Sequence, residues 1–104
     1  MNKLVLIVDC SKGEKIFFES IAAYCNEAKN LNINIFPVSF ELITPEYITE
    51  MSPDLIIAHD NFEDSVIGNV KKIVLIDTKS NDSRIVEVST PLTPQVFQNL
   101  FINL

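Results

Sequence analysis

Acidic, thiol and imidazole side chains follow directly on short apolar runs in this 104-residue chain. Asp9 and Cys10 come after LVLIV, His59 and Asp60 come after LIIA, and Asp77 comes after IVLI. Grouped carboxylates can hold a hard cation such as Mg²⁺. A cysteine at the beginning of a helix can act as a nucleophile, because its pKa is lowered there. Whether these side chains meet depends on the elements that position them.

Apolar runs of strand length alternate with segments of helical periodicity along the chain. The expected strands are 3–9, 33–40, 54–58, 73–77 and 84–89. The expected helices run from Ser11 to about Asn30, from Thr44 to about Met51, from Asp60 or Asn61 through Val70, and from Thr93 onward. Continuous apolar runs are typical of strands buried on both faces of a parallel sheet. The alternation predicts one α/β domain over 1–104, with a mainly parallel five-stranded sheet between helices.

Local signals mark several of these elements. Ser11 and Glu14 have the spacing of a capping box, and Thr44 precedes Pro45 as a helix start. Pro37 cannot donate to a ladder, so its strand is expected at an edge of the sheet or interrupted. The apolar face of the first helix is expected to comprise Phe17, Ile21, Tyr24, Cys25 and Ala28.

The direction of the last strand is left open by the sequence. Only the turn-rich segment 78–83 (TKSNDS) separates the fourth and fifth expected strands. Parallel crossovers commonly take a dozen or more residues, whereas an antiparallel return needs only a few. The fifth strand is therefore expected as a candidate antiparallel strand in an otherwise parallel sheet.

Composition excludes several classes of function. Hydrophobic residues make up 47% and charged residues 21% of the chain, as in ordinary globular proteins. The net charge of −6 and the scattered basic residues argue against binding to nucleic acid or to an anionic membrane. The apolar runs are too short to cross a bilayer, and the N-terminus has no cleavage-site pattern. Cys10 and Cys25 are expected as reduced thiols in a cytoplasmic protein.

Three stretches together resemble the receiver domain of bacterial response regulators: LIVDC at 6–10, SPDLIIAHD at 52–60 and STPLTPQVFQNL at 89–100. They are similar to the family's first strand with its acids, its third strand with the phosphoacceptor aspartate, and its fifth-strand Lys-Pro signature followed by the last helix. The resemblance covers most of the chain. It implies a flavodoxin-like three-layer α/β/α sandwich with an Mg²⁺-dependent phosphorylation site.

The metal and phosphate positions depart from the family's pattern. Asp9 matches the first acid of the family's pair, whereas Cys10 stands where the second acid would be. In strict register His59 falls at the phosphoacceptor position, and Asp60, one residue later, is the candidate phosphoacceptor. The resemblance leaves Asp9 and Asp60 as ligands for Mg²⁺, with one carboxylate lost because a thiol is a poor ligand for a hard cation.

The switch positions depart as well. Asp77 stands where the family has its hydroxyl residue, with Thr78 next to it, and Thr90 replaces the lysine that pairs with phosphate. Thr90-Pro91 keeps the dipeptide form of the turn and leaves a cis bond open. An antiparallel last strand would place Thr90 at the other end of the sheet. Without the lysine and the second acid, the chain is expected to be a degenerate receiver that is not phosphorylated.

The function expected from this resemblance is that of a pseudo-receiver. Such a domain would act through a protein partner or a homodimer, as the N-terminal module of a larger regulator where one exists. An enzymatic role is left open but not favoured. No cofactor is expected, and Mg²⁺ is left open. The alternative is a phosphocarrier, since Cys-Ser-Lys-Gly at 10–13 resembles the active loop of lactose/cellobiose-type IIB proteins, although Glu14 would repel a phosphoryl group. A third possibility is a small-ligand site formed by Asp9, Asp60 and Asp77.

Overall fold

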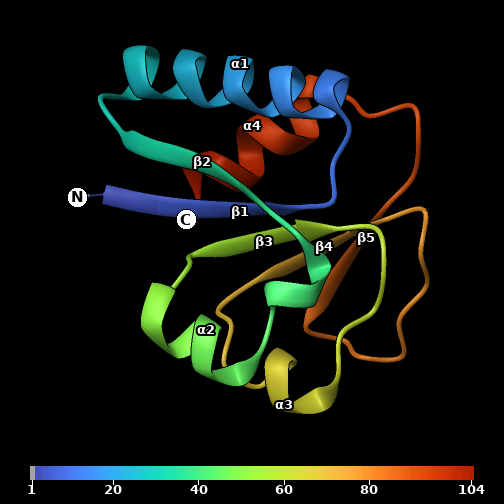
Figure 1. Ribbon diagram of the computed structural model, residues 1–104. Coiled ribbons are helices and arrows are strands. Elements are labelled where there is room, and N and C mark those ends of the chain that lie inside the picture. The colour runs from blue at the N-terminus through green and yellow to red at the C-terminus, as the bar shows by residue number, and fades with distance from the viewer. Residues whose placement is uncertain (1) are drawn as a thin grey trace.

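The computed structural model describes residues 2–104, in which strands and helices alternate as the sequence predicts (Figure 1). The strands are β1 (Asn2–Val8), β2 (Asn32–Val38), β3 (Leu55–Ala58), β4 (Ile73–Ile76) and β5 (Ile85–Val88). The helices are α1 (Lys12–Lys29), a single 3₁₀ turn at Phe40–Leu42, α2 (Pro45–Met51), α3 (Asp64–Ile67) and α4 (Pro94–Ile102).

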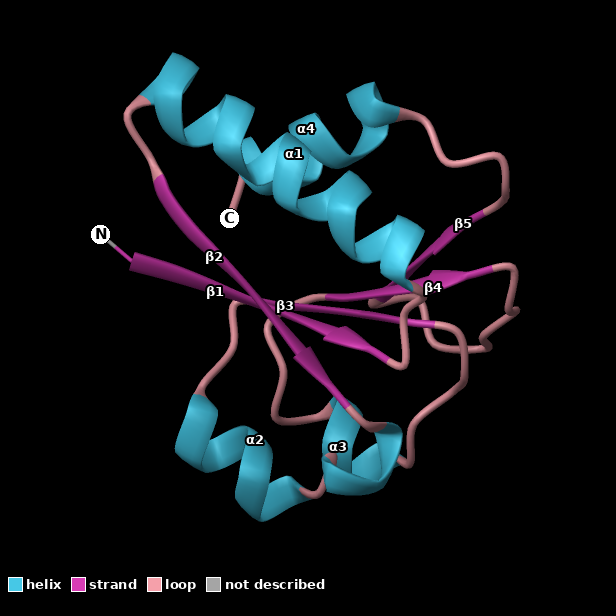
Figure 2. Ribbon diagram, turned by 45° about the horizontal axis from the view of Figure 1, so that its top comes forward, coloured by secondary structure: helices cyan, strands magenta, loops and turns pink. Residues whose placement is uncertain are grey.

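The strands form one sheet in the order β2-β1-β3-β4-β5, and all neighbouring pairs are parallel. Helices α1 and α4 cover one face, and α2 and α3 cover the other (Figures 1 and 2). The fold is therefore the predicted flavodoxin-like α/β/α sandwich. β2 lies at an edge of the sheet, as Pro37 predicted. The chain turns back across the sheet after β2, so β1 and β3 flank the point where strand order reverses, and ligands of such folds bind at the carboxyl ends there.

The expectation that the last strand could run antiparallel is wrong. β5 pairs with β4 in parallel, from Ile73 opposite Ile85 to Ile76 opposite Val88. The strands are short enough for a plain loop to make this connection. β4 and β5 have four residues each and are about 13 Å long. The connecting segment 77–84 can reach about 26 Å when extended. No crossover helix is needed for that distance.

Alternating side chains of the strands feed two separate cores. Val5 and Ile7 of β1 face α1 and α4, whereas Leu6 and Val8 face α2 and α3. No polar or charged side chain is buried among residues 2–104. The face under α1 and α4 is filled mainly by Val5, Ile7, Phe18, Ile21, Cys25, Leu55, Ile57, Val74, Ile76, Phe97 and Phe101.

The buried face of α1 differs in part from the predicted one. Phe18, Ile21, Ala22 and Cys25 are buried, whereas Tyr24 is 56% exposed and Ala28 is also exposed. The buried positions follow the i, i+3, i+4, i+7 spacing that forms one stripe on a helix. The predicted set contained Ile21 and Cys25 of this stripe, together with Tyr24 and Ala28, which lie beside it.

Helix α3 is much shorter than predicted, and neither Asp60 nor Asn61 caps it. It spans only Asp64–Ile67, with Glu63 at the N-cap position. The preceding segment is held in another way. The ring of Phe62 stacks on Phe40 at 5.1 Å between centroids, and the side-chain amide of Asn61 donates to the backbone carbonyl of Lys79 at 2.9 Å. These contacts fix 61–62 as a loop before the helix begins.

Replacing Phe97 by Ala should lower the free energy of unfolding by about 3–5 kcal/mol, because a fully buried aromatic ring leaves a cavity. The ring lies 4.9 Å from Phe18 and 5.9 Å from Phe17, centroid to centroid, at the junction of α1 and α4. Val96→Ala is the matched control, because its side chain on the same helix is 41% exposed and its loss should cost at most about 0.5 kcal/mol. Urea unfolding of both variants measures this, and equal losses would contradict the packing described.

Candidate functional site

The carboxyl end of β1 leads into a loop that Asp9 ties to the end of β2. The Asp9 amide donates to the carbonyl of Val38 at 2.9 Å, and its carboxylate accepts from the amide of Phe40 at 3.3 Å. Asp9 has a φ of 48°, in the left-handed region that Asp tolerates better than most residues. Asp9 therefore fixes the conformation of this loop.

Helix α1 begins with the predicted capping box. The Ser11 hydroxyl accepts from the amide of Glu14 at 3.1 Å, and Glu14 Oε1 accepts from the amide of Ser11 at 2.9 Å. The exchange satisfies two amides that the first turn of a helix leaves free. It also holds the Glu14 carboxylate in one place, beside the loop after β1.

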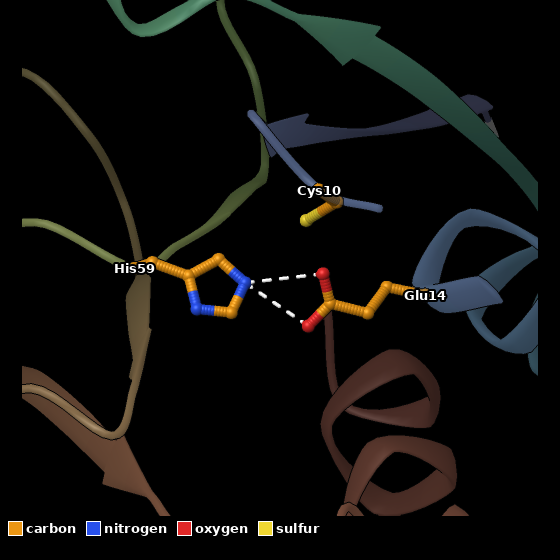
Figure 3. A group of neighbouring side chains, drawn as sticks. All are labelled: Cys10, Glu14 and His59. Carbon is orange, nitrogen blue, oxygen red and sulfur yellow. Dashed lines mark hydrogen bonds and ion pairs between the residues drawn. The ribbon is translucent and has the colours of Figure 1, made fainter. Parts of the chain in front are cut away.

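His59 reaches that carboxylate from the end of β3. Because side chains alternate along a strand, His59 lies on the same side of the sheet as Ile57, the side covered by α1. Its Nε2 lies 3.0 Å from Oε2 and 3.2 Å from Oε1 of Glu14 (Figure 3). The side chains are 36% and 21% exposed, respectively. This pair joins β3 to α1 across the point where strand order reverses.

Cys10 completes a three-residue cluster with Glu14 and His59, referred to below as the Cys10 cluster. One ligand atom from each residue, the Sγ, a carboxylate oxygen and a ring nitrogen, lies within 4.8 Å of the other two. The half-buried thiol donates to the carbonyl of Val8 at 3.7 Å. Burial, together with the carboxylates of Glu14 and Asp9, raises the pKa of the Cys10 thiol to about 12. With no cation bound, the thiol is therefore protonated at neutral pH.

Asp77 and Thr90 form a second contact at the same edge of the sheet, between the ends of β4 and β5. The Asp77 carboxylate accepts from the Thr90 amide and from the Thr90 hydroxyl, each at 2.8 Å. Both donors lower the pKa of Asp77, the amide more than the hydroxyl. The parallel direction of β5 brings Thr90 to this edge. The Thr90-Pro91 bond is cis, the form that the sequence left open.

The remaining predicted residues lie around these two contacts. The Thr78 hydroxyl donates to the carbonyl of His59, so it ties the end of β4 to the end of β3. Asp60 is exposed and lies outside the Cys10 cluster. The roles of Asp60 as phosphoacceptor and of Asp9 and Asp60 as ligands of Mg²⁺ stay predictions. The contact between Glu14 and His59 was not predicted, although Glu14 was placed in the first turn of the first helix and His59 at the end of the third strand.

A hollow of about 480 Å³ lies beside this edge, between the loops that follow β3 and β4. Lys79 is the one cation among its described lining residues, and Asp64 and Asp82 also line it. Asp82 is already paired with Arg84 at 2.5 Å. Lys79 is offset by Asp64, so the hollow offers no net positive charge for a phosphate-bearing ligand. Its lining residues are Asn61, Phe62, Asp64, Ile67, Lys79, Ser80, Asn81, Asp82 and Ser83.

Comparison with known proteins gives no match to this chain among family models, curated proteins or solved structures. Within residues 2–104, no helix combines the length and the apolar character needed to cross a bilayer.

Removing the Thr90 hydroxyl should move the pKa of Asp77 up toward its ordinary value, without restoring it fully because the Thr90 amide still donates. A depressed folded-state pKa stabilises the fold above the ordinary Asp pKa of about 3.9, and this contribution is lost as the pH falls through the folded-state value. Carboxyl carbon NMR titration of Thr90→Val measures the shift, with Thr90→Ser as the matched control. An unchanged Asp77 pKa in Thr90→Val would contradict the contact.

The Cys10 thiol should react slowly with iodoacetamide at neutral pH in the presence of EDTA, because its raised pKa leaves little thiolate. Glu14→Gln removes one of the carboxylates that raise this pKa and should speed alkylation. Mass analysis of the peptide that contains Cys10 follows the reaction separately from Cys25. Fast alkylation of the unmodified sequence below pH 8 would show that the thiol is not suppressed in this way.

Proposed function

We propose that the chain is a receiver-like signalling domain in the cytoplasm that acts through contact with a protein partner or a second copy of itself, without being switched by phosphorylation. The observation that carries the proposal is the His59–Glu14 pair, 3.0 Å apart at the carboxyl edge of the sheet. It fills the position where the receiver resemblance would place a phosphoacceptor. The fold and the strand-end location of all three resembling stretches support the receiver-like frame.

The charges at this edge argue against a phosphoryl group. Glu14 lies beside the acceptor position and would repel an incoming phosphate. The Thr90 that replaces lysine donates to Asp77 and brings no positive charge. The Thr78 hydroxyl is engaged by the carbonyl of His59, so a phosphate at this edge would have to break that contact to recruit it. Phosphoryl transfer depends on neutralising and positioning the phosphate oxygens, and these side chains do neither.

A protein contact is supported by apolar side chains left at the surface of α4. Val96 is 41% and Ile102 is 37% exposed. A groove of about 290 Å³ runs between β5 and α4, with Val86, Val88 and Leu92 among its lining residues. β5 is also an edge strand. Apolar side chains beside a free strand edge are features that protein contacts commonly cover.

The phosphocarrier alternative finds no such support. A carrier cysteine needs a lowered pKa, whereas burial, Glu14 and Asp9 raise that of Cys10 to about 12. Glu14 is moreover fixed next to the thiol by its capping bonds. For these reasons Cys10 is not proposed as a phosphorylated nucleophile.

Intact-protein mass measured promptly after incubation with Mg²⁺ and acetyl phosphate tests the proposal. No phosphate adduct is expected on the full chain, while a phosphorylatable receiver treated in parallel should gain one. An adduct that disappears in Asp60→Asn would identify a working receiver and overturn the proposal. An adduct that disappears in Cys10→Ser would instead identify a phosphocarrier.

A further inference from the structure

We propose that Cys10, Glu14 and His59 bind a divalent cation of the borderline class, zinc in particular, through one sulfur, one oxygen and one nitrogen ligand. The inference goes beyond the signalling proposal, which uses the His59–Glu14 pair of the same cluster, because it assigns a ligand to the Cys10 cluster and not a partner to the domain. It also differs from the Mg²⁺ site that the sequence left open, which would use Asp9 and Asp60.

Convergence of two distant parts of the chain, residues 10–14 and His59, is the first argument. Cys10 lies in the loop after β1, Glu14 in the first turn of α1 and His59 after the end of β3. Their three side chains are turned toward one shared space (Figure 3). Among residues 2–104, this is the one group of at least three Cys, His, Asp or Glu residues whose ligand atoms converge. Such convergence across 45 residues of sequence is not a product of one local turn.

The distances fit a small tetrahedral cation. Zn–N and Zn–O bonds of about 2.0 Å and a Zn–S bond of about 2.3 Å put ligand atoms about 3.3–3.5 Å apart. The Nε2 of His59 is already 3.0–3.2 Å from the Glu14 oxygens, and Cys10 Sγ lies within 4.8 Å. A side-chain movement of about 1 Å at Cys10 would complete the set. Three protein ligands leave the fourth position free for water or another ligand.

The ligand types select the cation. Thiolate and imidazole are poor ligands for Mg²⁺ and good ones for zinc, and the added carboxylate suits zinc as well. A bound Cys10 exchanges its S–H bond for an S–Zn bond and releases one proton to solvent. The thiolate and the Glu14 carboxylate then balance the two positive charges of the ion. The nearby Asp9 carboxylate favours a cation further.

Glu14 is held by an interaction of the kind that orients metal ligands. Its Oε1 accepts the Ser11 amide at 2.9 Å, and this leaves Oε2, 3.0 Å from His59, available to the ion. The backbone of His59 is fixed in turn, because its carbonyl accepts the Thr78 hydroxyl. Of these two contacts, the one from the Ser11 amide touches a ligating side chain, and outer partners of that sort commonly matter 10- to 100-fold for affinity.

Zinc titration of the reduced full chain against a chromophoric chelator tests the site, with Co²⁺ as a spectroscopic probe. One zinc ion per chain is expected, together with a thiolate-to-cobalt charge-transfer band. Cys10→Ser should remove that band. Cys10→Ser and His59→Gln should each weaken zinc binding at least about 100-fold, which exceeds the usual effect of an outer partner. Cys25→Ala is the control, because that thiol is buried on α1 outside the Cys10 cluster, and it should keep both signals.

Glu14→Gln separates the metal role from the structural role of this residue. Glutamine preserves the capping box, so α1 should remain intact by circular dichroism while zinc affinity falls at least about 10-fold. Three results would overturn the proposal: no zinc bound at stoichiometric concentration, binding unchanged in Cys10→Ser and His59→Gln, or binding lost in Asp60→Asn but kept in Glu14→Gln. The last would assign the metal to the strand-end aspartates.

Discussion

Burial of the three central strands on both faces is the constraint on which the rest of the molecule depends. β1, β3 and β4 carry apolar side chains toward both helical layers, and no polar side chain is buried among residues 2–104. Along these segments of the chain, polar side chains therefore occur only at or beyond the ends of the strands. Parallel pairing then brings the carboxyl ends to one edge, which gathers Asp9, Cys10, His59 and Asp77 along it. The reactive side chains that follow the strands gather there because the sheet itself buries only apolar side chains.

Glu14 shows how one residue can join local and long-range structure. Its place in the chain is dictated by the beginning of α1, where a carboxylate at the third position satisfies the amide of Ser11. The same carboxylate contacts His59, which follows β3, the strand next to β1. The helix cap thus holds a charged group in a fixed position at the sheet edge. Burial is the main cause of the raised pKa of Cys10, and this fixed negative charge raises it further, because a thiol cannot ionise beside a carboxylate without cost.

The sequence predicts the parts of this structure that local physics controls. Apolar runs located all five strands to within a few residues, and the spacing of Ser11 and Glu14 located the start of α1. The direction of β5 was left open because the expectation rested on loop length alone. It did not allow for strands so short that a plain loop spans them.

Local sequence patterns do not predict the contacts between distant segments. The stacking of Phe62 on Phe40 shortens α3, and nothing in the sequence around Asp60 signals it. The contact between His59 and Glu14 depends on the order of β1 and β3 in the sheet and on the face to which His59 is turned. A strand register one residue different would have turned Asp60 toward α1 instead, with a carboxylate facing Glu14. The identity of the site is therefore decided by pairing geometry and not by composition.

Two of the departures from the receiver resemblance, at Cys10 and His59, act on the sheet edge in the same direction. Under the proposed function, Cys10 in place of an acid and His59 in place of the phosphoacceptor both weaken the preference for a hard cation bound through oxygen. Both also introduce softer ligands, sulfur and imidazole nitrogen, at positions that lie within 4.8 Å of each other and of Glu14. If these positions only had to avoid binding Mg²⁺ and phosphate, many pairs of small polar residues would serve equally well. Convergence of a thiol, an imidazole and a fixed carboxylate is a more specific outcome, and it is the reason for assigning this edge a cation of its own.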